Sequence, residues 1–220
     1  MKIFHGEQRT DEWRKARAGL ATASCFHHIM AQGKKKGEES VGRRNYRIQV
    51  ALERMTGVQT SYDLSFNKDV VNGVEREPEL RRRYELATDA MIDEVLFIQH
   101  DSLACGVSPD GLILPHGAIE GKCPAPPAHA EYLRLVDEPP STYHWQVHGL
   151  MFVADLKWVD FVSFNPDFPP ELQLHIVRVN RDDHEIALLR EGLEQFLAEV
   201  TVTVNELREL ADKRRLPQAA

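Results

Sequence analysis

The chain has 220 residues, of which 42% are hydrophobic and 28% charged, and its formal net charge is −7. This composition is that of an ordinary soluble domain, and it excludes a disordered, collagen-like or disulfide-rich chain. Cys25, Cys105 and Cys123 form no C-x-x-C pair, so a cysteine-zinc site is not indicated and we expect three reduced thiols. The length favours a single domain over residues 1–220.

No apolar run approaches the ~20 residues that a membrane span requires, and residues 1–5 lack the apolar core of a secretory signal. We therefore expect a cytoplasmic protein without membrane contact. The acidic balance argues weakly against a nucleic-acid partner, because phosphate binding usually accompanies a basic surplus. Basic residues nevertheless cluster at 34–36, 43–44 and 81–83, although a solvated surface is the commoner origin of each cluster alone.

Hydrophobic periodicity, capping residues and glycine or proline breaks predict the elements in chain order. Helices are expected over 11–18, from an N-cap at Thr22 to residue 30, and over 46–56, 70–87, 128–135, 142–154 and 182–213. Strands are expected over 90–99, 103–107, 112–114 and 118–122 as one antiparallel meander, and over 158–164 and 172–179. Residues 33–42 are predicted to form a surface loop, and Pro78 to mark a kink or a restart of its helix. This order favours an α/β or α+β fold with a mixed central sheet.

The segment with chemical content is Gly-Val-Ser-Pro-Asp-Gly-Leu at 106–112, followed by Glu-Gly-Lys at 120–122. Two strands joined by a turn would place Asp110 beside this second motif, and Glu120 and Lys122 project from one face of a strand. Two carboxylates and an ammonium then converge, a set suited to phosphodiester hydrolysis with Mg²⁺ or Mn²⁺. Lys122 would orient the attacking water, stabilise the transition state or act as a base, and these roles stay open. Taken alone, the pattern also fits a turn aspartate and a surface Glu/Lys pair.

Together with their neighbours, Ser-Pro-Asp-Gly-Leu at 108–112 and Glu-Gly-Lys-Cys-Pro at 120–124 resemble the core motifs of the phage lambda exonuclease family. These viral recombination nucleases belong to the restriction-endonuclease-like superfamily, and the resemblance extends from Trp13 to about Asp183. It implies a restriction-endonuclease-like core, with a mixed central sheet flanked by helices, plus N-terminal helices. It also implies a Mg-dependent 5′-to-3′ exodeoxyribonuclease that degrades the 5′-phosphorylated strand of linear duplex DNA to mononucleotides and leaves a 3′ overhang.

The resemblance further implies a catalytic site with two Mg²⁺ ions, for which Mn²⁺ is expected to substitute. The implied ligands are Asp110, Glu120, the backbone carbonyl of Gly121, and Glu77 directly or through water, with Lys122 as the catalytic ammonium. Glu77 is identified by its register from a glycine in Gly-Val-Glu-Arg-Glu-Pro-Glu at 73–79. A neighbouring glutamate of this segment is the alternative.

The segment Trp-Arg-Lys-Ala-Arg-Ala-Gly at 13–19, continued by Thr-Ala-Ser at 22–24, resembles the family's N-terminal grip on a 5′-phosphate. Arg17 and Ser24 take these positions, and Ser108 and Gln146 of the Tyr-x-x-Gln pattern at 143–146 complete the implied pocket. An arginine fork and a hydroxyl near a helix N-terminus are suited to anions on physical grounds. The alternatives are a surface arginine and a helix-capping serine.

The family also implies a ring-shaped homotrimer around double-stranded DNA ends, a single-strand annealing recombinase as partner, and an apolar wedge near Val70 and Val71. Core packing explains these valines as well. We interpret the histidines as structural or surface residues, because hard-metal nuclease sites prefer oxygen ligands.

Two other functions compete with the exonuclease. A restriction-type endonuclease or repair nuclease of the same fold would share the metal core but lack the 5′-phosphate pocket. A catalytically idle module that binds DNA ends would act structurally in recombination, but the presence of Asp110, Glu120 and Lys122 argues against it.

Overall fold

The computed structural model describes residues 1–33, 35, 37–60 and 68–215, and for 68–74 and 215 the backbone alone. The expected wedge role of Val70 and Val71 therefore lies outside the described side chains. The α-helices are α1 Asp11–Arg17, α2 Phe26–Met30, α3 Val41–Thr56, α4 Lys68–Thr88, α5 Pro126–Tyr132, α6 His144–Val153 and α7 Asp183–Arg215. Three short 3₁₀ helices are η1 Ala23–Cys25, η2 Ser141–Tyr143 and η3 Pro170–Leu172. The strands are β1 Lys2–Phe4, β2 Ala21–Thr22, β3 Phe97–Gln99, β4 Cys105–Val107, β5 Gly111–Ile113, β6 Gly117–Lys122, β7 Trp158–Phe164 and β8 Leu174–Asn180.

The strands form two mixed four-stranded sheets, in the orders β1-β3-β4-β2 and β5-β6-β7-β8. In the first sheet β2 runs parallel to β4, and in the second β6 runs parallel to β7 while both outer pairs are antiparallel. The predicted mixed α/β class is confirmed. The expected single meander is wrong, because β3 and β4 pair with N-terminal strands whereas β5 and β6 join the C-terminal strands. Residues 108–110 carry the chain from one sheet to the other.

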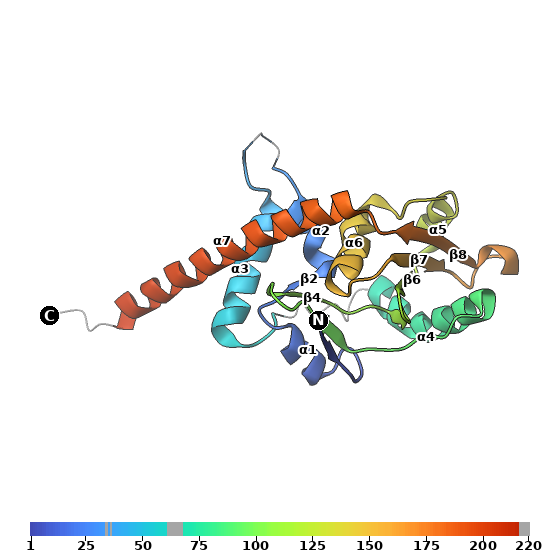
Figure 1. Cartoon of the computed structure of the whole chain (residues 1–220), viewed down its shortest axis with the longest axis horizontal. Coiled ribbons are helices and arrows are strands. Elements are labelled where there is room, and N and C mark those ends of the chain that lie inside the picture. The colour runs from blue at the N-terminus through green and yellow to red at the C-terminus, as the bar shows by residue number, and fades with distance from the viewer. Residues whose placement is uncertain (34, 36, 61–67, 216–220) are drawn as a thin grey trace.

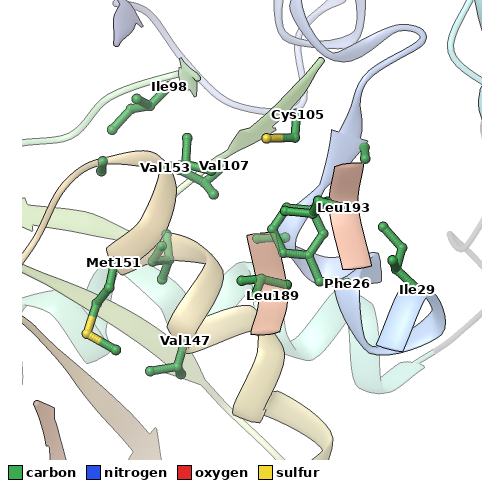
Figure 2. Close-up of a cluster of buried hydrophobic side chains, with 14 of the residues drawn as sticks. Phe26, Ile29, Ile98, Cys105, Val107, Val147, Met151, Val153, Leu189 and Leu193 are labelled. Atoms are coloured by element: carbon green, nitrogen blue, oxygen red, sulfur yellow. The ribbon is translucent and has the colours of Figure 1, made fainter. Parts of the chain in front are cut away.

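The larger hydrophobic core lies where α2, α6 and α7 meet β3 and β4 (Figure 2). Phe26, Val147 and Leu189 from the three helices are fully buried there. A Cβ at Gly149 of α6 would lie 2.7 Å from the Phe26 ring, so glycine permits this close approach of the two segments. The contact brings η1 and α2 against the helix that carries Gln146.

A second core fixes α4 on the β5–β8 sheet. Leu80 and Tyr84 of α4 are fully buried with Ile119 of β6 and with apolar residues of β7. The Tyr84 hydroxyl donates a hydrogen bond of 2.7 Å to Asp160 on β7, whose carboxylate also accepts two hydrogen bonds from Arg178 on β8. This polar link is buried at its centre and sets the position of α4 over the sheet.

Side-chain capping explains where α1 and α3 begin. The Thr10 hydroxyl accepts a hydrogen bond from the Trp13 amide and begins α1, and Ser40 begins α3 in the same way. The prediction that this helix starts at residue 46 is therefore late, and the predicted loop over 33–42 loses its last two residues to α3. Helix α4 continues through Pro78, so the predicted restart does not occur.

Three further expectations need correction. Thr22 occupies the N-cap position, but its side chain makes no capping hydrogen bond and is buried near Tyr46. Of the strand expected over 90–99, only β3 and an isolated bridge at Asp93 form. The last strand begins at Leu174, after η3, and not at 172.

Helix α7 runs across the molecule and extends beyond its body toward the C-terminus (Figure 1). Its bounds, Asp183–Arg215, agree closely with the prediction of 182–213. Among the described residues, no helix has the length and apolar character needed to cross a membrane.

Candidate active site

The β5–β6 hairpin brings the two predicted motifs together. Gly111 and Ile119 are direct partners in its antiparallel register, so Asp110 lies beside the continuation of β6. The backbone N–H of Gly121 donates a hydrogen bond of 2.7 Å to Asp110 Oδ2. Asp110, directly before β5, and Glu120 on β6 therefore lie side by side at one edge of the hairpin, as the sequence predicts.

The two oxygens of Glu120 have unequal surroundings. The Glu120 carboxylate is 2% exposed, and its Oε1 accepts hydrogen bonds from the Lys122 ammonium and, at 2.6 Å, from Gln146 Nε2. Its Oε2 is buried, and it has no hydrogen-bond partner among the described residues. The Lys122 ammonium also lies 5.0 Å from the centre of the Tyr143 ring. One carboxylate oxygen is thus satisfied, while the other is buried and bare.

Excess negative charge marks this site. Burial, followed by repulsion from Glu120, raises the pKa of Asp110 to about 7, although Lys122 opposes the shift. Burial lowers the pKa of Lys122, but attraction to Glu120 and Asp110 outweighs it and raises this pKa above the ordinary range. Two close carboxylates and one ammonium leave a net negative site that favours a bound cation.

Helix register separates the three glutamates near the start of α4. Glu77 is 12% exposed, and its oxygens accept hydrogen bonds of 2.6 Å from Arg9 and 2.7 Å from Arg81. Arg81 also donates to the backbone carbonyl of Asp110 at 3.2 Å. Glu75 is exposed, and Glu79 pairs with two exposed arginines of its own helix. Of the three, Glu77 therefore faces Asp110. Although burial would raise the pKa of Glu77, its two arginines hold this pKa below the usual range.

Arg17 and Ser108 are in direct contact. Arg17 Nη1 donates a hydrogen bond of 3.0 Å to Ser108 Oγ, and the indole N–H of Trp13 donates to the same oxygen at 2.9 Å. The guanidinium lies 4.1 Å from the centre of the Trp13 ring. Burial lowers the pKa of Arg17, and its Nε is buried without a partner among the described residues. A buried cationic donor with an unused N–H suits an anion.

The other two predicted phosphate contacts lie apart from this pair. Ser24 is exposed in η1, and within the described part of the chain it has no hydrogen bond to Arg17, Ser108 or Gln146. Gln146 instead donates to Glu120. Because η1 packs against α6, Ser24 and Gln146 lie on neighbouring elements.

A hollow of about 410 Å³ adjoins the Asp110 side of the site. Its lining is strongly charged and comes from Gly6, Glu7, Gln8, Arg9, Glu77, Arg81, Glu94, Val95, Pro109 and Asp110. The Gln8 amide donates to the Pro109 carbonyl at 2.9 Å and to Val95 at 3.3 Å, which fastens the N-terminal segment to the turn before Asp110.

His129, His144 and His148 have structural partners. The two ring nitrogens of His129 lie 2.7 Å from the Ser163 hydroxyl and 2.8 Å from the Leu172 carbonyl oxygen, and His129 is fully buried. His144 and His148 are four residues apart on α6, and His144 pairs with Glu185 at 2.9 Å. Across the described residues, no group of three or more His, Cys, Asp or Glu side chains is arranged to hold a metal ion. Among these side chains, Asp110 and Glu120 lie together at the hairpin, while Glu77 is bound by Arg9 and Arg81.

Sequence reasoning missed two site residues, Arg81 and Arg9. Arg81 lies four residues after Glu77, so helical spacing would have found it. Arg9 reaches the site through tertiary packing, and no local signal marks it.

Comparison with known proteins identifies the family and the fold. Residues 12–157 match the YqaJ-like viral recombinase domain. The alkaline exonuclease LHK-Exo from Laribacter hongkongensis has a TM-score of 0.83 and 33% identity, over 93% of this chain and 99% of that one. The same enzyme in complex with dAMP matches equally well. A phage related exonuclease from Haemophilus somnus 129PT has a TM-score of 0.67 and 15% identity over 86% and 96% of the two chains, which shows a shared fold.

No curated protein matches the chain. The family match covers well over half of the sequence, and the similarity to LHK-Exo extends over nearly all of both chains. The resemblance to lambda-type exonucleases that the motifs indicate is thereby confirmed. The chain therefore belongs to the family of YqaJ-like viral recombinase domains and shares its fold with an alkaline exonuclease.

Proposed function

We propose that this protein is a divalent-metal-dependent exonuclease that digests the 5′-phosphorylated strand of linear duplex DNA. The observation that carries the proposal is the pair of carboxylates at the β5–β6 hairpin, one of them with a buried and unpartnered oxygen beside the Lys122 ammonium. Such an oxygen, next to a second carboxylate with a raised pKa, is suited to a hard cation. The alkaline exonuclease activity named for LHK-Exo supports the same function.

We propose that two Mg²⁺ ions bind at this site, with Mn²⁺ as a substitute, because the buried oxygen of Glu120 without a partner among the described residues lies beside a second carboxylate. Asp110, Glu120 and the backbone carbonyl of Gly121 would hold them, and Glu77 would contribute through water while its arginines remain in place. When bound, these cations supply Lewis-acid polarisation of a phosphate oxygen and a more acidic bound water.

The protein's own groups then bind and orient the reacting phosphate. Attraction to two carboxylates keeps Lys122 cationic, which favours charge stabilisation over base catalysis among its three possible roles. Gln146 donates a hydrogen bond to Glu120 Oε1. The unpartnered Oε2 therefore points away from Gln146. Lys122 and Gln146 therefore fix the glutamate before any cation arrives.

End recognition follows from the connection between the sheets. Ser108 and Asp110 are only two residues apart in the chain, so the Arg17–Ser108 pair lies close to the proposed cleavage site. We assign the 5′-phosphate to Arg17 and Ser108, with Ser24 and Gln146 closing the pocket when DNA is bound. A terminal phosphate held there, with the next bond at the hairpin, gives 5′-to-3′ release of mononucleotides and a 3′ overhang. The binding of dAMP by LHK-Exo supports a mononucleotide product.

We extend the proposal to a homotrimer that encloses duplex DNA and to a single-strand annealing recombinase as partner. The viral recombinase family supports this role in recombination. Light scattering of the purified protein measures the mass of the assembly, and a monomer at micromolar concentration would argue against the ring.

One digestion experiment tests the function. A linear duplex carrying a 5′-phosphate on one strand and a 5′-hydroxyl on the other is incubated with Mg²⁺, with Mn²⁺ and with a chelator, and a circular plasmid is treated in parallel. We expect metal-dependent release of mononucleotides from the phosphorylated strand and an intact plasmid. Cutting of the circle would establish an endonuclease, and DNA binding without any metal-dependent digestion would establish an idle end-binding module.

A further inference from the structure

Arg9 has an unusual backbone conformation for a charged residue. Its φ of 69° lies in the left-handed region, which is strained for a residue other than glycine. The residues on each side are fixed, because Gln8 is bonded to the turn before Asp110 and Thr10 caps α1. This backbone aims the Arg9 side chain at Glu77, and the side chain stays 48% exposed.

The two arginines that bind Glu77 differ in how firmly they are held. Arg81 is 17% exposed and also pairs with Glu94 at 3.0 Å and with the backbone carbonyl of Asp110 at 3.2 Å. Among the described residues, Glu77 is the only charged partner of Arg9. Arg9 is thus the guanidinium that a competing cation would displace first.

The displaced side chain would stay close to the reaction. Arg9 and Asp110 line the same hollow of about 410 Å³ beside the hairpin. A divalent cation bound near Asp110 attracts the Glu77 carboxylate and repels the guanidinium, since both forces act at short range in a partly buried setting. A freed arginine fork makes two charge-assisted hydrogen bonds to a phosphate.

We propose that Arg9 is a DNA-phosphate ligand released from Glu77 by metal binding. The proposal rests on the proposed nuclease function and adds an order of events: without a cation Arg9 is held by Glu77, and with a cation it binds the backbone of the substrate strand. Metal and DNA then bind cooperatively, and each raises the affinity of the protein for the other.

The test compares DNA binding with and without a cation. Fluorescence anisotropy measures the affinity for a labelled 5′-phosphorylated duplex in Ca²⁺ and in a chelator, and a gel checks that the duplex stays uncut. We expect Ca²⁺ to raise the affinity of wild type for the duplex. In Arg9→Gln and Arg9→Gly this calcium-dependent increase in affinity should be about tenfold smaller than in wild type, because the charged hydrogen bonds are lost. Glycine suits the positive φ, so the second variant separates loss of the guanidinium from backbone strain.

Arg14→Gln is the matched control, because Arg14 is 47% exposed and has one ion pair, with Asp11, in the same part of the chain. Its calcium-dependent gain should equal that of wild type. Calorimetry without DNA supplies a second readout: both Arg9 variants should bind Ca²⁺ at least as tightly as wild type, because a competitor for Glu77 is gone. Weaker Ca²⁺ binding would show that Arg9 only holds Glu77 in place, and would overturn the proposal.

Digestion of linear duplex by wild type in Mg²⁺ is measured alongside. Absence of digestion overturns the proposed function. Digestion by wild type together with an unchanged calcium-dependent gain in both Arg9 variants overturns the assignment of Arg9 alone.

Discussion

At the scale of single residues, several groups of the site destabilise the folded protein as long as no ligand is bound. Glu120 keeps one oxygen bare, Asp110 has a raised pKa, and Arg17 has a buried N–H without a described partner. The two atoms without a described partner each cost folding free energy, about 1–3 kcal/mol for a buried polar group. Asp110 destabilises the fold in another way, because its charged form is disfavoured by burial and by Glu120. Such costs concentrate where a protein is built to bind.

Asp110→Asn should stabilise the metal-free protein and remove its response to metal. The folded-state pKa of Asp110 is raised to about 7, so wild type should lose stability as pH rises from about 4 toward 7, where the unfolded chain is already ionised. The variant should lack this part of the slope and gain about 1 kcal/mol or more near neutral pH. Thermal unfolding across this range, in a chelator and in Mn²⁺, measures both effects. Asp137→Asn, which removes an exposed charge, should change neither.

Lys122→Ala should separate binding from chemistry. Loss of an ammonium that acts in the transition state lowers turnover more than ground-state binding, so we expect single-turnover cleavage to fall by orders of magnitude with little change in DNA affinity. Lys122→Arg keeps the charge and serves as the comparison. A cleavage rate equal to that of wild type in the alanine variant would remove Lys122 from the mechanism.

Arg17→Met should abolish the preference for phosphorylated ends. The substitution keeps a long side chain against Trp13 but removes the donors that face Ser108. Charged hydrogen bonds contribute about 1.5–3 kcal/mol each, so wild type should prefer a 5′-phosphoryl over a 5′-hydroxyl duplex by roughly ten- to a hundredfold. Initial rates on the two substrates measure the ratio for both proteins. If the variant keeps the wild-type ratio, end recognition lies elsewhere.

At the scale of elements, the position of α4 decides whether Glu77 reaches the hairpin. The helix is fastened by Leu80 in the second core and by the hydrogen bond from Tyr84 to Asp160. Pro78 interrupts the helical hydrogen bonds without ending the helix, so tertiary packing holds this part of α4. Glu77 is therefore positioned by contacts one and two turns further along the helix.

Tyr84→Phe tests that positioning. Removing the hydroxyl leaves Asp160 with its two bonds from Arg178, so we expect a loss of about 1 kcal/mol in the free energy of unfolding. Chemical denaturation measures the loss, and calorimetry with Mn²⁺ shows whether the metal site moves with it. Thr88→Val at the end of the same helix, which removes a hydroxyl bonded to a backbone carbonyl, is the control for the site. If the variant has the same free energy of unfolding as wild type, the apolar contacts of α4 suffice to hold the helix in place.

The sequence alone predicts interactions between residues close in the chain, and it misses those between residues far apart. The two-residue period of a strand placed Glu120 and Lys122 on one face. Glu77 was identified only through the resemblance to the lambda exonuclease family, by its register from a glycine of the motif. The partition of the strands into two sheets escaped prediction, because β1 and β2 contribute few residues and pair with distant segments. Arg9 and the Gln146–Glu120 bond were missed for the same reason, since both join residues far apart in the chain.

At the scale of the whole molecule, α7 divides into a packed part and a projecting part. The helix is roughly 50 Å long at about 1.5 Å per residue. Its buried residues extend to Val204, and the described residues after it are exposed or half-buried. Isolated helical segments of this size are marginal in water, so the outer turns depend on a partner or fray.

Hydrogen exchange should reveal this division. Backbone amides after Val204 should exchange rapidly in a monomer, while those between Ile186 and Val200 should be protected by the core. If the proposed homotrimer covers the outer turns, their protection should rise with protein concentration. Mass-spectrometric exchange at two concentrations measures both regions, and equal protection along the whole helix at low concentration would contradict the division.

The sequence separation of paired strands differs between the two sheets, and this difference predicts an order of folding. Strands β5 to β8 come from one continuous stretch of chain, whereas β1 pairs with β3 and β2 with β4 across most of the N-terminal half. Contacts between distant segments form later, because closing long loops costs more conformational entropy. The hairpin with Asp110 and Glu120 should therefore be assembled before the segment with Arg17 reaches Ser108. During refolding of the full chain, the two carboxylates should therefore come together before the Arg17–Ser108 contact of the proposed end-binding pocket forms.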